Sequence, residues 1–116
     1  MLSAHRTGQG TPLVFLHAFP LSKLMWVKAH KGLSNHYQVI SIDLPGFGES
    51  PPLNQVKSIK SMADEVMLVL KHLIPRDKFF LFGVSMGGYV ALEILRSYAD
   101  RIRGLRLIST RATPYS

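Results

Sequence analysis

Ser85 is the residue of this chain whose setting most clearly indicates chemistry. It lies in the segment 83–88, Gly-Val-Ser-Met-Gly-Gly, between an apolar run at 79–82 and an amphipathic stretch. This pattern predicts a strand, a sharp turn and a helix, with the serine hydroxyl raised at the turn. The positive end of the helix would stabilise a developing oxyanion there. We therefore predict that Ser85 is a nucleophile, which attacks an ester or related carbonyl and forms an acyl-enzyme.

The residues around Ser85 support this interpretation. A Gly-x-Ser-x-Gly match is a weak signal by itself, and a chance match in a glycine-bearing turn is the alternative. Gly83 and Gly87 fit the sharp turn, because side chains there would collide with the neighbouring strand and helix. We expect the backbone N–H of Met86 to be one oxyanion donor. Phe19, in the loop after the first strand, is the candidate for the second donor, and an ordinary turn with a buried aromatic ring is the alternative.

Two further polar residues follow apolar runs. His17 ends the run at 11–17, and Asp43 ends the run at 37–43. Ligands bind beyond the carboxyl ends of parallel strands, so we expect both residues at the same edge as Ser85. A base must reach the hydroxyl proton, and we expect His17 instead to brace its loop through hydrogen bonds. We expect Asp43 to anchor a glycine-shaped turn. A dinucleotide-binding loop is excluded there, because Pro51 stands where its third glycine would be.

The elements that position these residues alternate along the chain. Apolar runs predict strands at 11–17, 37–43, 78–82 and 104–109, and helical periodicity predicts helices at 24–33, 58–73 and 86–98. Such alternation predicts parallel strands joined by right-handed crossovers. The expected fold class is α/β, with three layers and helices on both faces of a mostly parallel sheet.

Composition narrows the class of protein. The 116 residues form at most one domain, and 47% of them are hydrophobic. There is no cysteine, and no histidine pair has metal-ligand spacing with a third ligand, so we expect neither a metal nor a cofactor. We interpret the other histidines, at positions 5, 30, 36 and 72, as surface residues. The N-terminus lacks a signal-peptide core and no apolar run approaches the roughly 20 residues of a membrane span. A cytoplasmic protein without membrane contact is expected.

The net charge of +7 has three interpretations. A nucleic-acid partner is the least favoured, because the basic residues are scattered and no aromatic ladder accompanies them. A solvated basic surface is the favoured interpretation. The third is that the chain is the basic half of a longer molecule.

Three segments together resemble the α/β-hydrolase superfamily, and most closely its small esterases, lactonases and C–C hydrolases. They are 12–20, with His-Ala-Phe-Pro, 43–50, with Asp-Leu-Pro-Gly-Phe-Gly-Glu-Ser, and 83–88; the string at 101–105 also fits. The resemblance covers about residues 11–113. It implies a nucleophile elbow at Ser85, an oxyanion hole formed by Met86 and Phe19, and a small ester or lactone as substrate. A serine at 85 argues against the related haloalkane dehalogenases and epoxide hydrolases, which carry aspartate there.

The chain also departs from the family pattern. At most a stub of the usual first hairpin precedes Thr11, and the catalytic acid, the histidine and the lid generally come later than Ser116. We therefore expect residues 1–116 to be a single incomplete domain, truncated and weakly active or inactive. It could be a fragment, a short form that borrows a histidine or pairs its exposed edge strand in a homodimer, or a degenerate relative. The rival function is a non-catalytic α/β binding or dimerisation module.

Overall fold

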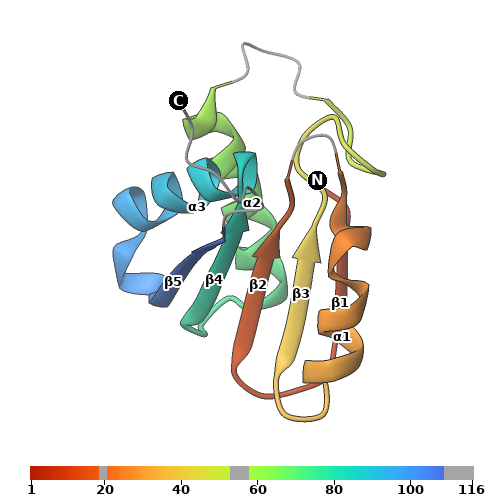
Figure 1. The fold of residues 1–116 in the computed structure, drawn as a ribbon. Helices are drawn as coiled ribbons and strands as arrows, with labels where there is room; N and C mark the ends of the chain where they lie inside the picture. The colour runs from red at the N-terminus through yellow and green to blue at the C-terminus, as the bar shows by residue number, and fades with distance from the viewer. Residues whose placement is uncertain (19–20, 53–57, 109–116) are drawn as a thin grey trace.

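The central feature of the computed structural model is a sheet with helices on both faces (Figure 1). The structure describes residues 1–18, 21–52 and 58–108. Within them the strand order is β1-β3-β2-β4-β5, and every pair except β1 with β3 is parallel. The strands are β1 (Ala4–Thr7), β2 (Pro12–Leu16), β3 (Gln38–Ile42), β4 (Phe79–Val84) and β5 (Ile102–Ile108). The expected α/β class with a mostly parallel sheet is confirmed.

Alternate side chains of the central strands feed two cores, one on each face. Val14 of β2 and Ile40 of β3 join a core with α2 (Ile59–Leu73) and α3 (Met86–Ser97). Phe15 of β2 faces the other way and packs with Trp26, the last residue of the 3₁₀ turn η1 (Lys23–Trp26), which leads into α1 (Val27–Leu33). Every residue of β2 is buried, as expected for a central parallel strand covered on both sides.

The helices begin where local chemistry supplies a cap. The side chain of Ser58 accepts a hydrogen bond from the Ser61 backbone N–H at 3.0 Å, and the side chain of Ser61 accepts one from the Ser58 backbone N–H at 3.0 Å, which forms a capping box before α2. The predicted helix at 58–73 is therefore confirmed with Ser58 as its cap. The helix expected at 24–33 is split, because residues 24–26 belong to the 3₁₀ turn η1 and the α-helix begins only at Val27.

The N-terminal strand differs most from expectation. The sequence suggested at most a stub of a hairpin before Thr11, yet β1 forms a full antiparallel pairing with β3, from Ala4 opposite Ile42 to Thr7 opposite Val39. The chain then turns at Gly8 into β2. Gly8 has a φ of +77°, and a side chain there would overlap the carbonyl oxygens of Tyr37 and Ser34.

His30 corrects the interpretation of the spare histidines as surface residues. It lies on α1, which packs against β3, and it is buried. Its Nδ1 lies 2.7 Å from the Thr7 hydroxyl and its Nε2 lies 2.8 Å from the Ser41 hydroxyl. Burial, followed by the nearby His5, lowers the pKa of His30. This histidine therefore ties β1, α1 and β3 together.

The far edge of the sheet is formed by β5. Within the described residues β5 pairs with β4 alone, and its last two residues, Leu107 and Ile108, are 49% and 37% exposed. The predicted strand at 104–109 thus starts earlier, at Ile102, and its last residue lies outside the described part of the chain. Across the described ranges, no helix combines the length and apolar character needed to cross a bilayer.

Candidate active site

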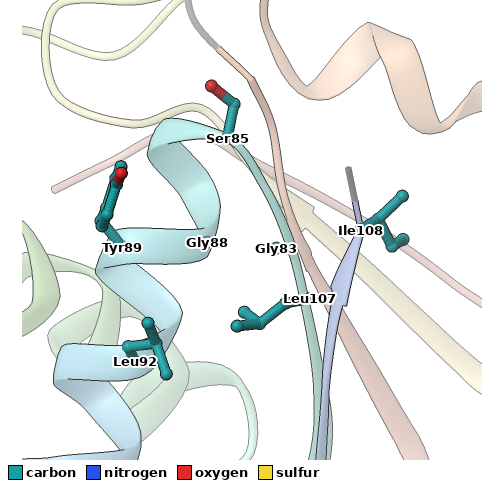
Figure 2. A pocket seen from close by; sticks show the side chains of 7 residues that line it. All are labelled: Gly83, Ser85, Gly88, Tyr89, Leu92, Leu107 and Ile108. Atoms are coloured by element: carbon teal, nitrogen blue, oxygen red, sulfur yellow. The ribbon is translucent and has the colours of Figure 1, made fainter. Parts of the chain in front are cut away.

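Ser85 occupies a strained turn between β4 and α3. Its φ of 54° and ψ of −115° make it the one non-glycine residue with positive φ in the described ranges. A side chain in this region costs on the order of 1–3 kcal/mol, which the surrounding packing must offset. The hydroxyl stands exposed at the start of α3 (Figure 2) and makes no capping hydrogen bond. The turn therefore presents the serine oxygen at the carboxyl end of β4.

Two glycines allow α3 to approach the sheet closely enough for this turn. A Cβ on Gly83 would lie 2.5 Å from the carbonyl oxygen of Gly87. A Cβ on Gly87 would lie 2.6 Å from the carbonyl oxygen of His17. Both positions require glycine, because backbone atoms cannot yield as a flexible side chain can. The first turn of α3 is thereby held directly against β4 and the end of β2.

The start of α3 offers backbone donors beside Ser85. The carbonyl oxygen of Ser85 accepts hydrogen bonds from Gly88 and Tyr89 at 2.9 and 3.3 Å, which begin the helix. Met86 is the first helical residue, and an N–H at this position has no acceptor within the helix. Its N–H, with the positive end of the 12-residue helix, can stabilise negative charge near the serine oxygen. Phe19, the expected second donor, lies outside the described residues.

His17 is fully buried at the end of β2. Its Nε2 accepts a hydrogen bond from the Leu44 backbone N–H at 2.9 Å, so the proton of the ring is on Nδ1, which donates to the Ala18 carbonyl oxygen at 3.0 Å. Burial lowers the pKa of His17, against smaller opposing effects of the Ala18 carbonyl and Asp43. Both ring nitrogens are thus occupied within the loops, and neither is available to take a proton from Ser85.

Asp43 is also fully buried and is surrounded by donors. Its carboxylate accepts from the Lys23 backbone N–H at 2.7 Å, the Lys23 ammonium at 2.6 Å and the Glu49 backbone N–H at 2.9 Å. Burial raises the pKa of Asp43, but these donors outweigh burial and hold the pKa below its ordinary value. The Ser50 hydroxyl donates to the Asp43 carbonyl oxygen at 2.6 Å and accepts from the Ser3 backbone N–H at 2.7 Å. Asp43 therefore anchors the turn that follows β3.

A small hollow opens beside Ser85. It has a volume of about 160 Å³ and lies between α3 and the end of β5 (Figure 2). Its lining is mostly apolar: Gly83, Ser85, Gly88, Tyr89, Leu92, Leu107 and Ile108. Such a hollow can hold a short apolar group whose carbonyl lies at the serine oxygen.

The structure brings some of the predicted site residues together and adds others. Ser85, His17 and Asp43 all lie at the carboxyl edge of the sheet, and Gly83 and Gly87 pack behind the serine. Lys23 was not predicted from the sequence, because its contact with Asp43 joins residues 20 positions apart and produces no periodic pattern. Within the described residues, the Ser85 hydroxyl has no side-chain partner, and no group of three acidic, histidine or cysteine residues could hold a metal.

A serine raised at a strained strand-to-helix turn, at the carboxyl edge of a parallel sheet layered by helices, defines a class of protein. The family model described as the alpha/beta hydrolase fold matches residues 11–116, and the chain belongs to this family. The expected resemblance is thereby confirmed.

Esterases are prominent among its relatives. The chain is 34% identical over 110 residues to a pimeloyl-[acyl-carrier protein] methyl ester esterase of Aeromonas hydrophila, covering 94% of this chain and 41% of the relative. A thermophilic esterase from Thermogutta terrifontis shares 41% identity with a TM-score of 0.88, over 99% of this chain and 42% of its own. An N-acyl homoserine lactone degrading enzyme shares 30% identity with a TM-score of 0.87, over 93% and 42%. The chain thus spans about two fifths of the length of these relatives.

Proposed function

We propose that this chain carries the nucleophile of a serine hydrolase that acts on a carboxylic ester or lactone. The Ser85 oxygen attacks the substrate carbonyl and forms an acyl-enzyme, which water then hydrolyses. The N–H groups of Met86 and Phe19 stabilise the oxyanion of the tetrahedral intermediate. The observation that carries this proposal is the positive φ of Ser85 at the junction of β4 and α3.

The proton of Ser85 needs an acceptor that the described residues do not supply. His17 is engaged on both ring nitrogens, so a histidine and an acid must come from elsewhere. The relatives extend well beyond the region that matches this chain, and we propose that the intact protein carries these groups, with a lid, in the same part. Without a triad member, turnover falls by roughly 10⁴-fold or more, so residues 1–116 alone are expected to be weakly active or inactive.

The substrate class follows from the hollow and the relatives. Its apolar lining and small volume suit a short acyl or alcohol group. Relatives named as a methyl ester esterase and as a lactone degrading enzyme support an ester or a lactone. We propose a small neutral ester or lactone as substrate, with no metal, cofactor or nucleic acid involved.

Labelling with a fluorophosphonate tests the assignment. In the intact protein, we expect the probe to label the wild type and a Ser97→Ala control equally, because Ser97 lies at the far end of α3. Ser85→Ala should abolish the labelling. Equal labelling of the Ser85→Ala variant and the wild type would remove Ser85 from its proposed role.

One observation favours a second candidate, a non-catalytic binding or dimerisation module. The edge of β5 has no partner strand within the described residues, and Leu107 and Ile108 are exposed beside it. Such an edge can pair with the edge of a second copy. Arg103 and Arg106 are exposed on the same strand and would repel their counterparts, which favours the hydrolase.

A further inference from the structure

His30 is a buried histidine that the proposed hydrolase mechanism does not use. It lies on α1, beside the edge strand β1 (Figure 1), and both of its ring nitrogens meet hydroxyl groups. Nδ1 lies 2.7 Å from the Thr7 hydroxyl oxygen, and Nε2 lies 2.8 Å from the Ser41 hydroxyl oxygen. Burial, followed by the nearby His5, lowers the pKa of His30, so the ring is neutral at pH 7.5 and carries one proton. The position of that proton decides the direction in which the two hydroxyl groups donate.

Ser41 determines which nitrogen of His30 carries the proton. Its side chain is fully buried in β3, and within the described residues its hydroxyl has one hydrogen-bond partner, His30 Nε2. If Nε2 carried the proton, the Ser41 oxygen would accept it, and the O–H of Ser41 would be buried without an acceptor. Buried donors are rarely left in this state, because they lose their bonds to water without replacement. Ser41 therefore donates to Nε2, and the ring proton lies on Nδ1.

The same arrangement leaves the Thr7 hydroxyl free to donate. The Nδ1–H of His30 donates to the Thr7 oxygen, so the O–H of Thr7 must point to a partner other than the ring. No second partner of this hydroxyl lies within the part of the chain that the structure describes. Thr7 is partly buried and lines a hollow, so its O–H is available to an acceptor that enters the hollow.

The hollow that Thr7 lines lies between β1 and α1 and shares no lining residue with the one beside Ser85. Its volume is about 300 Å³, at the lower end of the range for small-molecule sites. The lining residues, which define the β1–α1 hollow, are His5, Thr7, Val27, His30, Lys31 and Ser34. None of them is acidic, and among the described residues the exposed Lys31 has no carboxylate partner. The hollow therefore offers a hydrogen-bond donor and a positive charge that no described carboxylate neutralises.

The remaining lining suits the apolar body of a ligand. Val27 is 42% exposed, and the His5 ring packs against the buried His30 ring with centroids 4.4 Å apart, which holds this wall in place. We propose that the β1–α1 hollow binds a small aromatic carboxylate, which accepts a hydrogen bond from the Thr7 hydroxyl and lies beside the Lys31 ammonium. The ring of the ligand packs against Val27 and His5. This site is additional to the candidate active site and does not depend on the role of Ser85.

Nitrogen chemical shifts of the histidine rings test the hydrogen-bond argument in the intact protein. At pH 7.5 we expect the His30 ring of the wild type to carry its proton on Nδ1. Ser41→Ala removes the donor to Nε2 and should shift His30 toward the tautomer with the proton on Nε2. A wild-type ring with its proton on Nε2 would overturn the proposal, because the Thr7 hydroxyl would then donate to His30 and not into the hollow.

Calorimetric titration of the intact protein with benzoate tests the site itself. We expect saturable binding, which weakens at least fivefold in Lys31→Met and in Thr7→Val and is retained in Thr7→Ser. Lys28→Met changes an exposed lysine of the same helix outside the hollow, and this matched control should bind benzoate as the wild type does. Lys31 is exposed, so its variant keeps the test valid if Thr7→Val does not fold.

Two further measurements establish where and how benzoate binds. Benzamide, which has the same shape without the charge, should bind at least fivefold more weakly than benzoate. Benzoate should shift the ring signals of His5 and His30, and Ser85→Ala should bind it as tightly as the wild type. Binding that does not saturate, equal affinity of Lys31→Met and the wild type, or loss of binding in Ser85→Ala would overturn the proposal.

Discussion

His17 shows how a single buried side chain makes this site sensitive to pH. Its unprotonated Nε2 is the acceptor for the Leu44 N–H, and protonation would place two donors face to face. The folded state therefore resists protonation, and the pKa of His17 is lowered, mainly by burial. The folded state is therefore most stable relative to the unfolded state above pH 6.5, the ordinary pKa of histidine. As pH falls below 6.5 toward the lower pKa of folded His17, the unfolded chain binds the proton first and this stability is lost.

The fall in stability below pH 6.5 can be tested by urea unfolding. Between pH 7.5 and 5.5 His17 should cost the wild type up to about 1.4 kcal/mol of unfolding free energy, because the unfolded chain gains at most one proton at this histidine below its ordinary pKa of 6.5. His17→Asn, whose amide can accept from Leu44 and donate to Ala18, should lose measurably less over the same interval. His30, whose pKa is also lowered, makes the same contribution to the pH dependence of unfolding in the wild type and in the variant. An identical pH dependence in the wild type and the variant would show that His17 is not the group responsible.

At the scale of elements, α2 is the element that the sequence pattern predicts most clearly. Its apolar residues repeat on one face, and its buried members include Val66, Leu70 and Met62. β1 could not be predicted in the same way, because Ala4–Thr7 is short and only partly buried, and its pairing with β3 is set by tertiary packing. The burial of His30 follows from that packing, and no pattern in the residues around it predicts this burial. The Gly-x-Ser-x-Gly turn was predictable because only glycine fits at Gly83 and Gly87, where a side chain would clash with nearby backbone.

The element with the most direct consequence for solution behaviour is β5. If the chain is the nucleophile-bearing part of a hydrolase, the exposed Leu107 at the end of β5 should make residues 1–116 alone associate through apolar contacts without a fixed stoichiometry, even though Arg103 and Arg106 oppose regular strand pairing. Sedimentation velocity should show a broad distribution, which Leu107→Lys narrows toward the 13.0 kDa monomer. A compact dimer that survives dilution would favour the binding or dimerisation module.

At the scale of the whole molecule, the structure places the proposed nucleophile at the carboxyl edge of the sheet, and the proposed function needs further groups that the described residues do not supply. The carboxyl edge holds Ser85, the start of α3 and the loops anchored by His17 and Asp43, and we propose that Ser85 and the start of α3 supply nucleophilic attack and oxyanion stabilisation. The relatives are more than twice as long as the region that matches this chain, and we propose that the acid and the histidine lie in the corresponding remainder of the intact protein. The sequence predicted the first group of residues from local motifs, whereas contacts such as Lys23 with Asp43 emerge only once the loops are folded together.

The most direct test of the central proposal is to trap the acyl-enzyme. The intact protein is mixed with p-nitrophenyl butyrate and quenched in acid during the first turnover, and the acylated peptide is mapped by mass spectrometry. We predict a butyryl group on Ser85, absent from the Ser85→Ala variant. Hydrolysis of the ester at the wild-type rate by Ser85→Ala, or a butyryl group mapped to a different residue, would contradict the account.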